Sequence, residues 1–199
     1  MCGESATFLR LLKADYERLS GRALAEARVL DYGAGWGRLT RMFLQHIPDD
    51  RVDAVDAWER SVELFNGLGF RGVCRLVEPM PTLPVPGHYD LIVLFSVLTH
   101  LPRDMAEAVL ASLGRAFAPG GLLAATIRPG AIWVRQDEPE RAAEHERTGY
   151  SHRPQGAAWG DTSMTVEYLT IRFPEWRLVD VESGMEAWNQ TLVFLAPSR

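Results

Sequence analysis

A short apolar run followed by evenly spaced glycines constrains the fold of this chain more than any other feature. Residues 27–30 lead into Asp31, and Gly33, Gly35 and Gly37 then occupy every second position. Glycine takes positive φ freely and has no Cβ to hold a ligand away, so it suits a tight loop beneath a ligand. The first turn of a following helix offers unpaired N–H groups to polar ligand atoms. The segment therefore predicts a strand, a nucleotide-type binding loop and a helix, with an ordinary strand–helix turn as the alternative.

The glycine spacing indicates which kind of nucleotide loop is present. The dinucleotide fingerprint G-x-G-x-x-G requires glycine at position 38, where the chain has Arg38. The observed D-x-G-x-G-x-G pattern instead resembles the first motif of class I S-adenosylmethionine-dependent methyltransferases. That resemblance implies a loop under the methionine end of the cofactor, with Asp31 facing the cofactor's amino group directly or through water. The loop residues that would bind S-adenosyl-L-methionine are then Gly33, Ala34, Gly35 and Gly37.

Two carboxylates further along the chain are candidates for the rest of the cofactor. Asp56 ends a predicted second strand about 20 residues after Gly37, where an acid can accept hydrogen bonds from ribose hydroxyls. The resemblance places Ala57 near the adenine. The alternative is that Asp56 caps a helix beginning near Trp58. Glu78 is the candidate for the adenine amino group, although it lies about one residue out of the family's register, and a plain loop charge is the equal alternative.

Polar side chains follow the predicted fourth strand, where ligands of open α/β sheets bind. Residues 94–102 resemble a Ser-Val-Phe-Thr-His-Leu segment of a bacterial subgroup of the same family, and this places Ser96 beside the cofactor. His100 is the candidate catalytic base, because an imidazole pKa near 6.5 suits proton transfer around neutrality. A hydrogen bond to its own loop, with no catalytic part, is the alternative. Similar strings at residues 118–121, 126–129 and 159–164 extend the resemblance over nearly the whole chain.

Strand and helix patterns alternate along the chain, which favours a parallel doubly wound sheet. The resemblance implies an α/β, Rossmann-like sheet of seven strands, mostly parallel with the last antiparallel, and helices on both faces. We expect one methyltransferase domain over residues 1–199, with an N-terminal helix at about 5–20. Strands are expected near residues 28–32, 51–56, 73–77, 89–95, 122–127, 176–181 and 190–195. Helices are expected near 37–47 and 61–66, through the series Met105, Val109, Leu113 and Phe117, and through Met164, Tyr168 and Ile171.

A polar segment at about 131–160 interrupts this alternation. Roughly thirty residues with little apolar periodicity predict a lid or binding loop on the substrate side, or else a solvated loop. Its histidine, arginine and aromatic residues suit a small polar acceptor better than a lipid. Asp161 is expected to cap the next helix, and a position facing the substrate is the alternative. His46 is expected in the core or at the cofactor's edge.

Composition narrows the function. The chain has 199 residues, 47% of them hydrophobic, which suffices for one packed domain. No apolar run reaches the roughly 18–20 residues of a membrane span, and no signal peptide pattern is present. Cys2 and Cys74 lack metal-ligand spacing, so we expect a reduced cytoplasmic protein without a metal. A net charge of −5, with Lys13 as the only lysine, argues against a nucleic-acid partner.

The sequence therefore predicts an S-adenosylmethionine-dependent methyltransferase acting on oxygen or nitrogen of a small polar acceptor, such as a sugar or specialised metabolite. It predicts no nucleic-acid or membrane partner and leaves monomer and homodimer open. A non-catalytic cofactor-binding partner protein and a nicotinamide-dependent oxidoreductase are the alternatives, and Arg38 argues against the second. A nucleic-acid methyltransferase is disfavoured, because the Asn/Asp-Pro-Pro-aromatic string of base-methylating enzymes is absent from residues 95–98.

Overall fold

Seven strands form the central sheet of the computed structural model, which describes residues 2–69, 72–79, 88–156 and 158–198. The strand order is β3-β2-β1-β4-β5-β9-β8. The first five strands pair in parallel, whereas β9 is antiparallel to both of its neighbours, as predicted. The strands are β1 (Val29–Tyr32), β2 (Val52–Asp56), β3 (Cys74–Leu76), β4 (Tyr89–Leu94), β5 (Phe117–Ile127), β8 (Trp176–Glu182) and β9 (Thr191–Pro197). The fold is the predicted Rossmann-like one.

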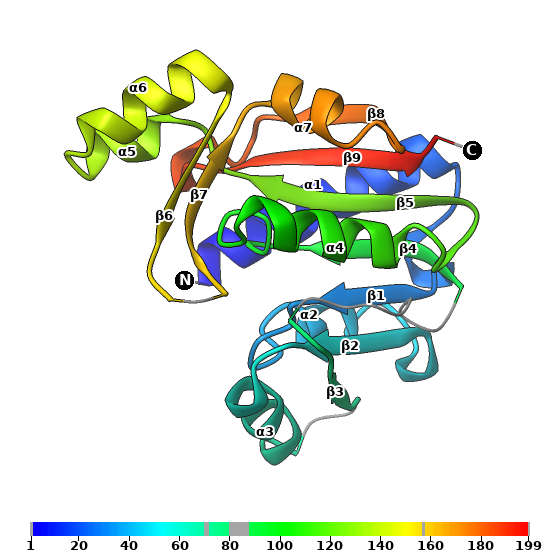
Figure 1. Cartoon of the computed structure of the whole chain (residues 1–199). Coiled ribbons are helices and arrows are strands. Elements are labelled where there is room, and N and C mark those ends of the chain that lie inside the picture. The colour runs from blue at the N-terminus through cyan, green and yellow to red at the C-terminus, as the bar shows by residue number, and fades with distance from the viewer. Residues whose placement is uncertain (1, 70–71, 80–87, 157, 199) are drawn as a thin grey trace.

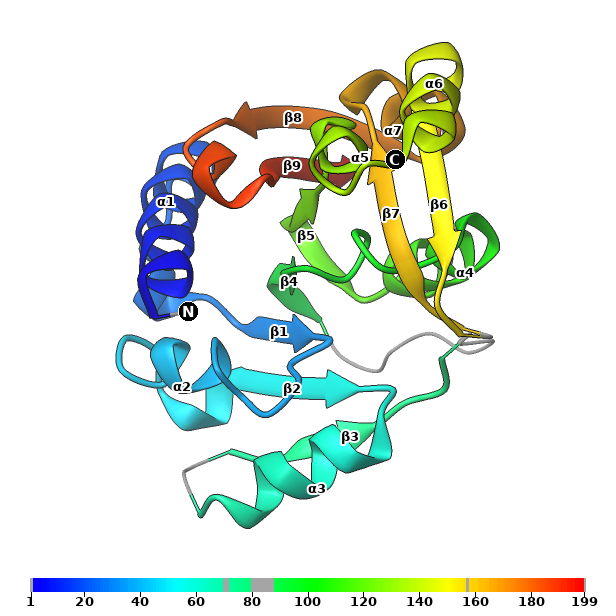
Figure 2. The same ribbon diagram turned by 90° about the vertical axis from the view of Figure 1, so that its left-hand side faces the viewer.

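Helices cover both faces of this sheet (Figures 1 and 2). α1 and α2 pack on one face, and α4 and α7 pack on the other. The helices are α1 (Cys2–Ser20), α2 (Thr40–Phe43), α3 (Glu59–Gly67), α4 (Arg103–Leu113), α5 (Ala131–Arg135), α6 (Pro139–Thr148) and α7 (Val166–Arg172). Short 3₁₀ turns lie at Leu24–Glu26, Asp49–Arg51 and Glu186–Trp188. No helix of the described ranges has the length and apolar character needed to cross a bilayer.

The central strand β4 shows why its sequence is continuously apolar. Leu91 and Val93 join the core under α1, whereas Ile92 and Leu94 join the core under α4, because successive side chains point to opposite faces. All four are fully buried. Burying one such side chain contributes about 1.5–3 kcal/mol. A strand covered on both faces therefore fixes the place where the order of the strands reverses, between the neighbouring strands β1 and β4.

Three predicted element boundaries are wrong. The helix expected over 37–47 is reduced to α2, because the loop continues in turns as far as Leu39. Phe117 belongs to β5, where it pairs with Tyr89 rather than extending the fourfold spacing of α4. Met164 ends a strand, and α7 begins after it. The spacing of apolar residues alone does not distinguish a position in a helix from the end residue of a neighbouring strand.

The segment 131–160 is regular rather than an extended loop. It contains α5, α6 and β6 (Tyr150–Pro154), and β6 pairs with the antiparallel β7 (Gly160–Met164) in a separate two-stranded sheet. Backbone bonds join the hairpin to the turn after β4, with Gly160 N donating to His100 O at 2.9 Å and Thr162 N to Thr99 O at 2.9 Å. The hairpin therefore stands over the carboxyl end of the sheet (Figure 2).

Candidate functional site

The glycine loop lies at the carboxyl ends of β1 and β2. Gly33, Gly35 and Gly37 all have positive φ, at 77°, 57° and 87°. The N–H groups of Gly33 and Ala34 both donate to Val55 O, at 2.9 and 3.1 Å, and tie the loop to β2. The loop thus turns back over the carboxyl edge of the sheet. Its backbone stays uncovered at the three glycines, because glycine has no side chain.

Gly33 is also required by close packing. A Cβ built on it would lie 2.5 Å from Val97 Cγ2, whereas a Cβ on Gly35 meets nothing within 4 Å. Valine is stiff at χ1 and does not move aside readily. The two positions therefore share a positive φ but differ in available space.

Gly33→Ala is expected to lower the free energy of unfolding by about 2–5 kcal/mol, combining left-handed strain with overpacking. Gly35→Ala, the matched control, should cost only about 1–2 kcal/mol because strain acts alone. Thermal and urea unfolding measure both. Adding Val97→Ala to Gly33→Ala should recover part of the loss, and equal costs for the two single variants would contradict the packing argument.

Asp31 ends β1 beneath the loop. Its side chain is 1% exposed and accepts a hydrogen bond from Thr40 Oγ1 at 2.5 Å. Burial raises the pKa of this carboxyl to about 6, and the nearby charge of Asp56 acts in the same direction, against the bond from Thr40. The anion is therefore costly here, and a cationic ligand group beside it would be favoured.

Asp56 holds the loop from the neighbouring strand end. Its Oδ2 accepts from Gly35 N and its Oδ1 accepts from Trp58 N, both at 2.8 Å. The second bond forms a local turn before α3. It is not the helix cap that was predicted as the alternative to ribose binding, because Trp58 is the N-cap residue and α3 has no side-chain capping bond. Each carboxylate oxygen keeps further lone-pair capacity. Asp56 can therefore support the loop and bind ribose hydroxyls in the same geometry.

Ser96 follows β4 with a φ of 61°, a left-handed conformation that is uncommon outside glycine. Its N–H donates to Thr126 Oγ1 at 2.8 Å, and its hydroxyl lies 3.3 Å from Thr99 Oγ1. Such conformations persist where the surroundings enforce them, often at ligand sites.

A cavity of about 350 Å³ lies over the loop and brings several predicted residues together. It is lined by Asp31, Gly33, Ala34, Gly35, Trp36, Arg38, Leu39, Phe95 and Ser96. The predictions missed Trp36, Arg38, Leu39 and Phe95, although the first two stand inside or next to the glycine pattern. Gly37, Asp56, Ala57 and Glu78 do not line it. Ala57 and Glu78 are exposed, and the chain after residue 79 lies outside the described residues until residue 88.

His100 lies in the turn after β4, against the hairpin. Its Nδ1 donates to Gly160 O at 2.8 Å, which fixes the tautomer and leaves Nε2 as an acceptor. Burial lowers the pKa of His100 below its usual 6.5, opposed by the bond to Gly160. No described residue hydrogen-bonds Nε2, and a neutral imidazole with such a lone pair has the chemistry of a general base. The bond to the loop, predicted as the alternative role, is present as well.

Asp161 does not cap the next helix, as had been expected. Thr165 caps α7 by accepting from Tyr168 N at 3.0 Å. Asp161 lies in β7 instead, where it accepts from Arg128 at 2.7 Å and from Arg153 at 2.5 Å. Its Oδ1 is 3.8 Å from His100 Nδ1. A capping pattern considers only neighbouring residues, so it could not predict that Asp161 pairs with two arginines from other segments.

His46 is exposed in the turn that follows α2, so its expected place in the core is wrong. Within the described ranges, no group of three histidine, cysteine, aspartate or glutamate residues is placed to hold a metal ion.

Comparison with known proteins agrees with this geometry. A family model described as a methyltransferase domain matches residues 30–123. The tRNA N(3)-cytidine methyltransferase METTL2 of Gallus gallus is 28% identical over 122 residues, which cover 56% of this chain and 33% of that protein. The chain therefore spans about a third of the length of this curated relative.

Two solved structures share the fold over most of this chain. Magnesium protoporphyrin IX methyltransferase (ChlM) from Synechocystis PCC 6803, with bound SAH, has a TM-score of 0.66 and 16% identity, covering 99% of this chain and 83% of that one. The 1,6-didemethyltoxoflavin-N1-methyltransferase of Burkholderia thailandensis has a TM-score of 0.65 and 22% identity, covering 95% and 77%. The matched domain, the glycine loop and the strand order all agree with the fold of the class I S-adenosylmethionine-dependent methyltransferases, which this chain resembles.

Proposed function

We propose that this protein transfers the methyl group of S-adenosyl-L-methionine to an oxygen or nitrogen of a small polar acceptor, such as a sugar or specialised metabolite. The observation that carries the proposal is the glycine loop held between Asp31 and Asp56 at adjacent strand ends. When bound, the cofactor would supply an electrophilic methyl group on a sulfonium. The acceptor atom forms a bond to the methyl carbon as the carbon–sulfur bond breaks, and it gives up a proton.

The residues of the loop fit this cofactor. Asp31 is buried with a raised pKa, so a ligand ammonium group would relieve the cost of its charge. Asp56 offers lone pairs for ribose hydroxyls next to a loop backbone without side chains. The pyrophosphate of a dinucleotide would instead lie beside two carboxylates. The site therefore suits a cofactor with a cationic amino group and no phosphate.

The protein's part in the reaction is mainly alignment. Holding the reacting atoms in line within a closed site is worth about 7–11 kcal/mol. His100 would accept the acceptor's proton on Nε2, because Nδ1 is committed to Gly160 O. We infer that residues 1–199 act as one domain and that the α5–α6–hairpin segment covers the acceptor, since it bonds to the turn that carries His100.

Calorimetric titration with S-adenosylhomocysteine and, separately, with NAD⁺ tests the cofactor. Micromolar binding of S-adenosylhomocysteine with no binding of NAD⁺ is expected. The opposite pattern, in folded protein, would favour the nicotinamide oxidoreductase.

The match to a tRNA methyltransferase makes tRNA the second candidate acceptor. A net charge of −5 opposes it, because nucleic-acid affinity comes largely from neutralised phosphates. Transfer of labelled methyl groups to total tRNA, compared with transfer to a small-metabolite mixture, separates the two. Label in tRNA alone would overturn the small-acceptor proposal.

The pH dependence of cofactor binding should follow Asp31. With a pKa of about 6, its carboxylate is mostly protonated at pH 5 and mostly ionised at pH 7. If the anion holds the ligand ammonium, affinity for S-adenosylhomocysteine should rise about tenfold between these values. Calorimetry on Asp31→Asn is the control, which should bind weakly with a flat profile. An unchanged slope in that variant would assign the pH dependence to another group.

A further inference from the structure

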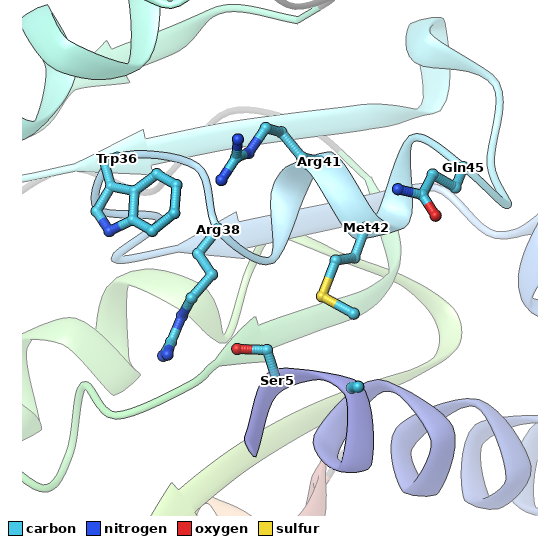
Figure 3. Close-up of a pocket in the computed structure, with 7 residues that line it drawn as sticks. Ser5, Trp36, Arg38, Arg41, Met42 and Gln45 are labelled. Carbon is cyan, nitrogen blue, oxygen red and sulfur yellow. The ribbon is translucent and has the colours of Figure 1, made fainter. Parts of the chain in front are cut away.

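A second cavity lies between the first turns of α1 and the loop that leads into α2 (Figure 3). Its volume is about 540 Å³. It is lined by Ser5, Ala6, Trp36, Arg38, Arg41, Met42 and Gln45, and we call it the α1–α2 groove. Trp36 and Arg38 also line the cavity over the glycine loop. The groove therefore adjoins the cofactor cavity and shares these two lining residues with it.

The charge of the α1–α2 groove is opposite to that of the protein. Two arginines line it and none of its lining residues is acidic, in a chain of net charge −5. Arg38 forms an ion pair with Glu4, but the nitrogen–oxygen distance of 3.5 Å is longer than that of a strong charged hydrogen bond. Guanidinium groups stay charged at any physiological pH. An anion is therefore the favoured kind of ligand.

The positions of the two arginines are set by the loop. Arg41 Nε donates to Gly37 O at 3.3 Å, and its guanidinium carbon lies 4.4 Å from the centre of the Trp36 ring. Figure 3 shows Arg41 turned back toward Trp36, whereas Arg38 extends toward Ser5. The two guanidinium groups therefore point to different parts of the groove, that of Arg41 to the indole and that of Arg38 to Ser5.

Ser5 supplies an independent sign of a polar ligand. The residue is 1% exposed, and its hydroxyl has no hydrogen-bond partner among the described residues. In Figure 3 this hydroxyl points into the groove on the side of Arg38. A buried hydroxyl without a partner is unfavourable, and a ligand oxygen between Ser5 and Arg38 would satisfy it.

The remaining wall is flat and apolar. Trp36 is 44% exposed, although buried aromatic surface would stabilise the fold. The thioether of Met42 lies on the other side of Arg38 in the same groove (Figure 3). Aromatic faces and thioethers both pack well against a planar ring.

We propose that the α1–α2 groove binds the planar, anionic part of the methyl acceptor, so that the acceptor is an aromatic carboxylic acid. The carboxylate lies at Arg38 and Ser5, and the ring lies against Trp36 and Met42. The role of this acid as methyl acceptor rests on the proposed function, but the binding of an aromatic acid to the groove can be measured independently of methyl transfer.

The test uses salicylate and its uncharged amide, salicylamide, as probes of the full chain saturated with S-adenosylhomocysteine. We expect calorimetry or ligand-detected NMR to show saturable salicylate binding, at least fivefold tighter than salicylamide. Ser5→Ala removes the hydroxyl proposed to bind the carboxylate, and Ser5 lines the α1–α2 groove but not the cofactor cavity, so the variant should weaken salicylate at least fivefold. Ser183→Ala, at an exposed serine after β8, is the matched control and should change nothing.

Each failure has its own meaning. Equal affinity for salicylate and salicylamide, or no effect of Ser5→Ala in folded protein, overturns the assignment of an acid site. Competition between salicylate and S-adenosylhomocysteine also overturns it, because the groove would then serve the cofactor's own carboxylate. If S-adenosylhomocysteine does not bind while salicylate still distinguishes the variants, the proposed function fails and the acid site stands.

Discussion

Replacing His100 with alanine is expected to lower kcat about 10²–10⁴-fold, the range for loss of a positioned general base. KM for the acceptor should change little, because the imidazole would act on the proton rather than on the bound ground state. Steady-state rates with an identified acceptor measure both constants. His46→Ala removes an exposed histidine elsewhere and should leave the rate unchanged.

A variant that keeps the structural bond separates catalysis from folding. In His100→Asn the side-chain amide can still donate to Gly160 O, as Nδ1 does at 2.8 Å, but it offers no base. It should therefore be as slow as the alanine variant. Normal turnover by His100→Asn would assign His100 to the structure of the turn alone. Normal cofactor binding with no turnover by the unmodified protein would favour the non-catalytic partner protein.

The pH profile gives a second readout of the same group. Because burial lowers the pKa of His100, its basic form predominates above a pKa that lies below 6.5. The rate should rise as pH increases through that lowered pKa and then level off. Neither His100 variant should retain this limb, provided that the cofactor is kept saturating so that Asp31 does not contribute.

Asp56→Ala is expected to weaken S-adenosylhomocysteine binding by about 100-fold or more. Hydrogen bonds to a charged group contribute about 1.5–3 kcal/mol each, and two ribose hydroxyls would lose their acceptor. The substitution also removes the acceptors of Gly35 N and Trp58 N, so the loop loses its link to the end of β2. Calorimetry at constant pH measures the affinity.

Two further variants make this result specific. Asp56→Asn retains one acceptor oxygen and should fall between the unmodified protein and Asp56→Ala. Asp50→Ala removes an exposed carboxylate at the opposite end of β2 and should leave the affinity unchanged. If Asp56→Ala lowered the free energy of unfolding yet bound the ligand normally, the carboxylate would only support the loop and the turn before α3. The ribose assignment would then be wrong.

The cofactor half of the molecule could be predicted from the sequence because its signals are local. A buried parallel strand must be apolar along its whole length, and a loop with positive φ at alternate positions requires glycine. Both conditions are written in consecutive residues, at 27–37 and 89–95. The expected positions of the seven strands were confirmed for the same reason, apart from the earlier start of β5 at Phe117. The antiparallel direction of the last strand came instead from the family resemblance, and the structure confirms it.

The half of the molecule that contains residues 131–160 depended on contacts between distant segments. The segment 131–160 folds because its polar groups bond to one another across the hairpin, with Trp133 Nε1 donating to Ser163 Oγ at 2.6 Å and His145 bonding the same oxygen at 2.8 Å. Such pairs leave no apolar periodicity in the sequence. Asp161 joins Arg128 and Arg153 in the same way.

The sequence by itself thus determined where the strands lie along the chain, the glycine loop and the carboxylates that flank the loop. Each of these features depends on residues that are neighbours in the sequence. Only the tertiary structure decided that Asp56 holds Gly35, that His100 keeps Nε2 open, and that Arg38, Arg41 and Ser5 share a groove. Those relations join residues from separate elements, and hydrogen-bond geometry and burial exist only once the elements are packed together.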